Sequence, residues 1–198
     1  FGMSRTPLRE VLQKLAGEGF VDITQNKGAK VVSMDMAVMR SFFQTAPLIY
    51  ANIARLACEN RSLPQLKALK VSQQHFKKAT LNNEPAQAAM YNHQFHHIIG
   101  DMSQNCYLIP SLQRMLIDHT RLSQTFYRPA SPAESALVRQ ACEQHDQMIA
   151  AIENRHAEGA VDLTLQHWAL SQDRMERFVR PDPLPVELAS PKETANAI

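Results

Sequence analysis

Apolar side chains recur at helical spacing from residue 34 almost to residue 180, and this pattern constrains the fold more than any other feature of the sequence. Breaks rich in proline, asparagine or serine interrupt the pattern at residues 61–64, 82–85, 103–105 and 128–132, and another break is expected near Glu158 and Gly159. Pro47 lies inside the first segment and is expected to kink or split it. Because short connections join antiparallel neighbours, residues 34–180 are predicted to form an antiparallel bundle of about six or seven helices.

A shorter helix is expected before this bundle. Ser4 and Thr6 are residue types that cap helix N-termini, Pro7 suits the first turn, and Gly17 and Gly19 suit the end of a helix. Its expected buried stripe consists of four apolar residues at helical spacing, Leu8, Val11, Leu12 and Leu15.

A hairpin is expected directly after this helix. Residues 20–24 and 29–33 resemble two short strands, with a turn at residues 25–28. A helix followed at once by a hairpin with basic residues near its tip is typical of the C-terminal part of a winged helix-turn-helix domain, so residues 1–33 are assigned to that module. The fold class predicted is therefore mainly α, with a recognition helix and a β-wing ahead of the bundle. On composition alone, the alternative is a capped surface helix that carries two arginines.

Residues 4–31 read SRTPLREVLQKLAGEGFVDITQNKGAKV and resemble the signature of GntR-family transcription regulators. The stretch is similar to S-R-T-P-hydrophobic-R-E-A-L, then L-x-x-E-G, then a wing that ends in G-x-x-V, with Val11 in place of the usual alanine. The resemblance implies a homodimer that binds double-stranded operator DNA. It also implies that earlier helices of the DNA-binding domain precede residues 1–3, so that its N-terminal part is missing from this chain.

The resemblance identifies which side chains are expected to contact DNA. The predicted set is Ser4, Arg5, Thr6, Arg9, Lys14, Lys27 and Gly28. Arg5 and Arg9 lie four residues apart, so both project from the N-terminal turn that faces base edges in a recognition helix. Residues 1–30 hold five basic and three acidic side chains, which accounts for the whole formal charge of +2. This distribution fits a DNA-contacting module that is joined to a neutral domain.

Three histidines lie on the apolar stripes of three different predicted helices of the bundle, at positions 96, 145 and 167. A single histidine on such a stripe is usually a core residue with a hydrogen-bond partner. Three that point inward from separate helices favour a shared centre, because buried polar groups need partners and bundle interiors are common metal sites. Neutral imidazoles with oxygen ligands suit Zn²⁺ or Ni²⁺, which are the divalent transition metals we expect.

The bundle resembles the FCD effector domain of FadR-type GntR regulators over roughly residues 35–180. Residues 92–96, NHQFH, are similar to the motif [D/N]-x-x-F-H, and the spacing from His96 to His145 and to His167 is similar as well. The resemblance implies a metal site formed by Asn92, His96, His145 and His167, with Asn92 where metal-binding members usually have aspartate. It also implies a small organic acid as effector, for which His119 and Arg121 are candidate contacts.

The favoured function is therefore a ligand-responsive transcription regulator and not an enzyme. The alternatives are a metal-dependent hydrolase that uses the three histidines and a structural helical domain whose core histidines are satisfied. Cys58, Cys106 and Cys142 form no C-x-x-C pair, and no apolar run approaches the roughly 20 residues of a membrane span, so buried free thiols in the cytoplasm and no membrane partner are expected. Residues 181–198 hold four prolines and no periodicity, which predicts an irregular tail.

Overall fold

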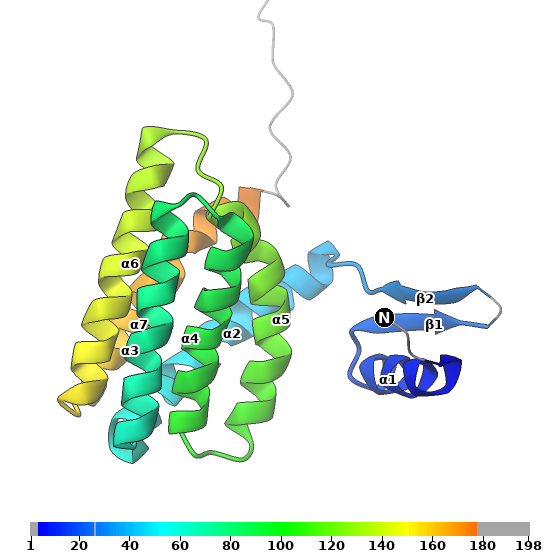
Figure 1. The fold of residues 1–198 in the computed structure, drawn as a ribbon, viewed down its shortest axis with the longest axis horizontal. Coiled ribbons are helices and arrows are strands. Elements are labelled where there is room, and N and C mark those ends of the chain that lie inside the picture. Colours follow the sequence, from blue (N-terminus) through cyan, green and yellow to red (C-terminus); the bar gives the residue numbers. More distant parts are fainter. Residues whose placement is uncertain (1–3, 26, 178–198) are drawn as a thin grey trace, which may run out of the picture.

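The computed structural model describes residues 4–25 and 27–177 and divides them into a helix–hairpin module and a six-helix bundle (Figure 1). The predicted fold class, mainly α with a partial winged helix-turn-helix ahead of the bundle, is confirmed. The irregular tail predicted for residues 181–198 lies outside the described residues, as do residues 1–3.

The helix–hairpin module consists of α1 (Arg5–Gly17), β1 (Val21–Thr24) and β2 (Gly28–Val31). Ser4 occupies the N-cap, and Gly19 adopts φ of +75°, where a side chain would be strained. This conformation lets the amide of Phe20 donate to the carbonyl of Leu15 at 2.9 Å, which closes the helix and starts the hairpin. The two strands pair antiparallel, with Val21 opposite Val31.

The expected burial of the apolar stripe of α1 is wrong for its first half. Leu8 and Val11 are exposed, whereas Leu12 and Leu15 are half-buried. The physical reason is that α1 packs against β1, and the chain returns at the C-terminal end of the helix, where the amide of Phe20 bonds the carbonyl of Leu15.

The bundle contains six helices: α2 (Met36–Asn60), α3 (Leu63–Leu81), α4 (Pro85–Met102), α5 (Leu108–Phe126), α6 (Pro132–Glu153) and α7 (Ala157–Arg177). Capping side chains define where several of these helices begin. The side chain of Asp35 accepts a hydrogen bond from the amide of Val38, and Ser62 forms a capping box with Gln65. One main hydrophobic cluster draws residues from all six helices, so the centre of the bundle is enclosed.

Two sequence expectations about the bundle helices need correction. Pro47 does not split α2, which runs from Met36 to Asn60 without interruption, and the alternative of a kink stays a prediction. Ala46 and Tyr50 on either side of it are buried, and this packing outweighs the roughly 3 kcal/mol cost of an internal proline. The break before α7 lies at residues 154–156 and not at Gly159, because Arg155 adopts φ of +57° and the amide of His156 caps the carbonyl of Ala151 at 2.9 Å.

The three cysteines are free thiols, as expected, but only Cys58 is fully buried, whereas Cys106 is exposed. Among the helices of the described residues, none combines the length and the apolar character needed to cross a bilayer.

Candidate metal centre

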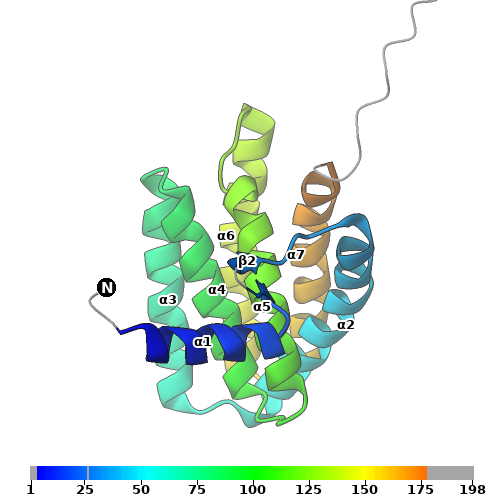
Figure 2. The ribbon, with the colours of Figure 1, turned by 90° about the vertical axis from the view of Figure 1, so that its right-hand side faces the viewer.

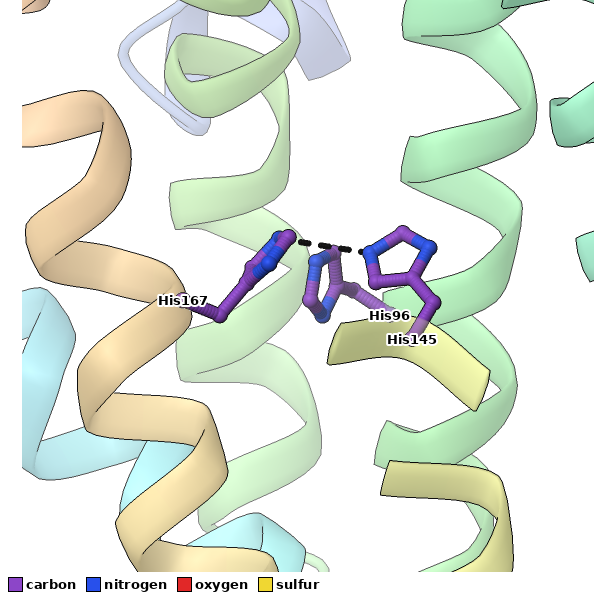
Figure 3. Close-up of side chains that lie close together, drawn as sticks. All are labelled: His96, His145 and His167. Carbon is purple, nitrogen blue, oxygen red and sulfur yellow. Dashed lines mark hydrogen bonds between the residues drawn. The ribbon is translucent and has the colours of Figure 1, made fainter. Parts of the chain in front are cut away.

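Three helices of the bundle each contribute one buried histidine to a single point in the core. His96 comes from α4, His145 from α6 and His167 from α7, and one ring nitrogen of each lies within 4.8 Å of the others (Figure 3). The Nε2 atoms of His145 and His167 are 3.2 Å apart. Two nitrogens bound tetrahedrally to one zinc ion at about 2.0–2.1 Å lie roughly 3.3 Å apart, so this spacing fits two ligands of one ion.

Two glutamine side chains determine where the ring protons lie. The Nδ1–H of His145 donates to Oε1 of Gln73 at 3.0 Å, and the Nδ1–H of His167 donates to Oε1 of Gln144 at 3.1 Å. An amide oxygen only accepts, so Nε2 of His145 presents a lone pair to His167, and Nε2 of His167 presents one in return while the Gln144 amide keeps this orientation. Facing lone pairs repel unless a cation lies between them, and histidine ligands of metals are typically oriented by such outer hydrogen bonds.

Two more buried atoms at the site have no partner among the described residues. These are Nε2 of His96 and Oδ1 of Asn92, which lie one turn apart on α4. An unpaired buried polar atom is costly, and both atoms are metal-ligand types. Asn92, His96, His145 and His167 therefore fit a divalent ion, with three imidazole nitrogens and one amide oxygen as donors.

Burial keeps the imidazoles neutral, which is the form that binds metal. It lowers the pKa of His167 from 6.5 to about 4. It also lowers the pKa values of His96 and His145 well below 6.5, and the neighbouring histidines lower them further. At neutral pH all three rings are available as ligands.

His119 lies against the same site from α5. Its Nδ1 is 2.9 Å from the hydroxyl of Tyr50, and its ring centroid is 5.5 Å from that of His96. Burial, assisted by His167 and His93, lowers the pKa of His119 to about 3. Arg121, the other effector candidate, lies elsewhere: its side chain contacts Asp118 at 3.3 Å beside the helix–hairpin module.

These shifts predict that the metal-free protein loses stability in acid. A histidine whose pKa is lower in the folded state than in the unfolded state takes up a proton on unfolding. Above pH 6.5 the ring is neutral in both states, and the free energy of unfolding keeps its full value. As the pH falls from 6.5 toward the folded pKa, protonation of the unfolded state lowers that free energy. For His119, urea unfolding should show a loss of up to about 1.4 kcal/mol per pH unit below pH 6.5. In His119→Leu, the number of protons taken up on unfolding in acid should fall by about one, so stability should depend less steeply on pH. Leu112→Ala, a core variant, should lower stability without changing the slope; equal slopes in wild type and His119→Leu would contradict the expectation.

Sequence reasoning missed the residues that orient the histidines. Gln73, Gln144 and Tyr50 are all buried. A polar residue on an otherwise apolar helix face was the available signal, since Gln73 lies between Leu69 and Phe76 on the buried side of α3.

The residues predicted to contact DNA gather on the helix–hairpin module. In Figure 2, α1 runs across the view in front of the bundle helices. The side chains of Ser4, Thr6, Arg9 and Lys14 on this module are exposed, as are Lys27 and Gly28 at the hairpin turn. The side chain of Arg5 lies outside the described residues.

The fold and site together define a class: a helical bundle with a buried cluster of metal-type ligands, joined to a helix–hairpin module. Residues 43–170 match the FCD domain family, and the chain belongs to that family. The expected resemblance to GntR-type regulators with an FCD domain is thereby confirmed.

Individual proteins agree with this assignment. The "Nta operon transcriptional regulator" of Aminobacter aminovorans is 31% identical over 68 residues, which are 34% of this chain and 32% of that protein, so the match spans about a third of its length. Among solved structures, E. coli McbR/YncC superimposes with a TM-score of 0.79 at 18% identity and covers 90% of this chain and 83% of its own. Streptococcus agalactiae GntR gives a TM-score of 0.58 at 19% identity, over 87% and 83% of the two chains.

Proposed function

We propose that the protein is a ligand-responsive, DNA-binding transcription regulator that acts in the cytoplasm as a homodimer. The α1 helix and the hairpin, within residues 1–33, bind operator DNA, and the bundle, residues 34–180, senses a small organic acid. The observation that carries the proposal is the combination in one chain of an exposed basic helix–hairpin module and an FCD bundle that buries three converging histidines.

The DNA-facing role rests on exposed side chains of two kinds. Arg9 projects from the first half of α1, where a recognition helix meets base edges, and Lys14 follows on the same helix. Lys27 and Gly28 lie at the hairpin turn, where a wing approaches the phosphate backbone or the minor groove.

The sensing role rests on the charge of the proposed metal ligands. Asn92 and the three histidines are all neutral, so a bound Zn²⁺ or Ni²⁺ would keep its full double positive charge inside the core. A buried charge of this size favours an anionic partner, which points to a carboxylate effector. The ion would supply an electrophilic coordination position for that carboxylate, while the glutamines hold the imidazoles in place.

Two neighbouring residues on α5 face the two ends of a proposed path between the metal site and the DNA-binding module, His119 toward the histidines and Asp118 toward the helix–hairpin module. His119 lies against the metal site, and the adjacent Asp118 is buried, where it pairs with Arg114 at 2.9 Å. The guanidinium of Arg114 in turn lies over the ring of Phe20, 4.4 Å from its centroid, immediately before β1. A movement of α5 on effector binding would therefore be felt at the base of the hairpin, beside a cavity of about 250 Å³ between module and bundle.

A hydrolytic role for the histidines receives less support. In the part of the chain that the structure describes, the metal-type cluster is made of histidines alone. Metal-assisted hydrolysis is commonly aided by a general base, and the carboxylate of Asp118 is already paired with arginines.

A ligand screen tests the proposed function. The metal-loaded protein should be stabilised against heat by at least one member of a panel of small mono- and dicarboxylates and sugar acids. The reason is that a ligand of the native state alone adds about 2.7 kcal/mol when present at one hundred times its Kd. The same compound should change the affinity of the full-length protein for its operator. A panel that stabilises the protein without altering operator binding would contradict a regulatory role.

A further inference from the structure

A chain of hydrogen bonds runs from the surface of the bundle to the ring of His145. The Gln73 side chain is buried on α3, and its amide nitrogen donates to the backbone carbonyl of Cys142 at 2.9 Å and to Oδ1 of Asp146 at 3.1 Å. Both partners accept only, so the amide cannot turn around without placing its oxygen against two other oxygens. Its oxygen is therefore held toward Nδ1 of His145, 3.0 Å away.

The outer end of this chain is an ion pair at the surface. The other carboxylate oxygen of Asp146 is 2.6 Å from Nζ of Lys77, and each side chain is 44% exposed. The pair thus holds the carboxylate where it can accept from Gln73. Asp146 directly follows His145 on α6, but it bonds the amide nitrogen of Gln73, whereas His145 bonds the amide oxygen.

We propose that Gln73 and Asp146 are positioning residues that hold the proton of His145 on Nδ1 and so direct its Nε2 lone pair at the metal. This inference rests on the metal site proposed above. The ring plane is already held by Phe95, which stacks on His145 at 3.9 Å with an angle of 9°. Stacking holds the orientation of a ring but does not distinguish its two nitrogens, so the choice of tautomer falls to the amide.

The first test reads the tautomer directly, without metal. In the metal-free protein, long-range ¹H–¹⁵N NMR should show the proton of His145 on Nδ1. In Gln73→Met the acceptor is gone, and the proton should move to Nε2, where it can donate to His167. The same variant should bind Zn²⁺ about 10- to 100-fold more weakly in competition with a chromophoric chelator. Methionine has nearly the volume of glutamine, so a changed tautomer in Gln73→Met reports the lost acceptor and not a change in packing.

The second test uses a matched ion pair as control. Lys70 and Glu153 join the same two helices at 2.7 Å, and their side chains are each 45% exposed, but the hydrogen bonds of Gln73 go to Cys142, Asp146 and His145 instead. Asp146→Ala should weaken Zn²⁺ binding about two- to fivefold, because Gln73 keeps only one of its two acceptors. Glu153→Ala should leave Zn²⁺ binding unchanged.

The outcomes separate this inference from the metal site itself. If wild type binds no Zn²⁺ while the tautomer of His145 still follows Gln73, the proposed metal site is wrong and the positioning role stands. If wild type binds Zn²⁺ and Gln73→Met changes neither tautomer nor affinity, the positioning role is overturned. If Asp146→Ala and Glu153→Ala changed the affinity for Zn²⁺ equally, Asp146 would have no positioning role.

Discussion

Replacing His145 with alanine is expected to abolish high-affinity metal binding. His145 is fully buried, and its Nε2 lies 3.2 Å from that of His167 at the point where the three rings converge. Its loss removes a central donor and leaves His96 and His167 as the remaining imidazoles, so the other ligands no longer close around one ion. Elemental analysis of untagged wild-type protein should find close to one equivalent of Zn²⁺ or Ni²⁺, and the variant should contain almost none.

The same change should remove the stabilisation that metal provides. At free metal one hundred times the Kd, binding adds about 2.7 kcal/mol, which raises Tm by roughly 5–10 °C for a chain of this size. His145→Gln, which leaves a smaller cavity, should behave like His145→Ala while its circular dichroism stays helical. His75→Ala, at an exposed position of α3, should keep both the metal and the shift in Tm. A wild-type protein that contains no metal and gains no stability from Zn²⁺ or Ni²⁺ would refute the site.

Helices could be predicted from the sequence where local chemistry decides their ends. Ser62 and Gln65 form a capping box within four residues of each other, and the start of α3 follows from them. Pro47 shows the limit of such reasoning. A local rule predicts a kink or a break, but Ala46 and Tyr50 are buried against distant helices, and periodicity alone cannot weigh that packing against the cost of one proline.

The candidate site could be predicted in its ligands but not in its supporting residues. His96, His145 and His167 stand out because a polar ring on an apolar stripe needs a partner, and three such rings can share one. Gln73 gives a weaker signal of the same kind, because its partner is 72 positions away and glutamine is common on helix surfaces. Which distant helix a side chain meets depends on how the helices pack, and the stripe pattern does not contain that information.

Arg121 shows how the same limit misplaces a residue. It is two positions from His119 on α5, yet it contacts Asp118 beside the helix–hairpin module while His119 turns toward Tyr50. Two residues along a helix differ by roughly 200° around its axis, so one faces the core and the other faces away. The structure thereby gives Arg121 a place in the contact between bundle and module and not at the histidines.

Replacing Arg9 with alanine in the full-length protein is expected to remove most of its preference for operator over random DNA. Arg9 is exposed in the first half of α1, and a bidentate contact from such an arginine to a guanine contributes about 1–3 kcal/mol of discrimination. If the protein binds as the proposed symmetric homodimer, the residue is used twice, the loss applies at both half-sites, and specific affinity should fall roughly 10²-fold or more. Footprinting and fluorescence anisotropy on operator and random DNA would measure it, and Arg5→Ala should behave in the same way.

Lys14 provides the contrast that identifies the kind of contact. A lysine that meets phosphate carries no sequence information, so Lys14→Ala should weaken binding to operator and random DNA alike and reduce the slope of log K against log salt by about one. Arg9→Ala should instead lower the ratio of specific to non-specific affinity. Arg139→Ala, at an exposed position on α6 in the bundle, should change neither quantity. Unchanged footprints in both Arg5→Ala and Arg9→Ala would remove α1 from the recognition surface, because these are the two arginines in the sequence of α1.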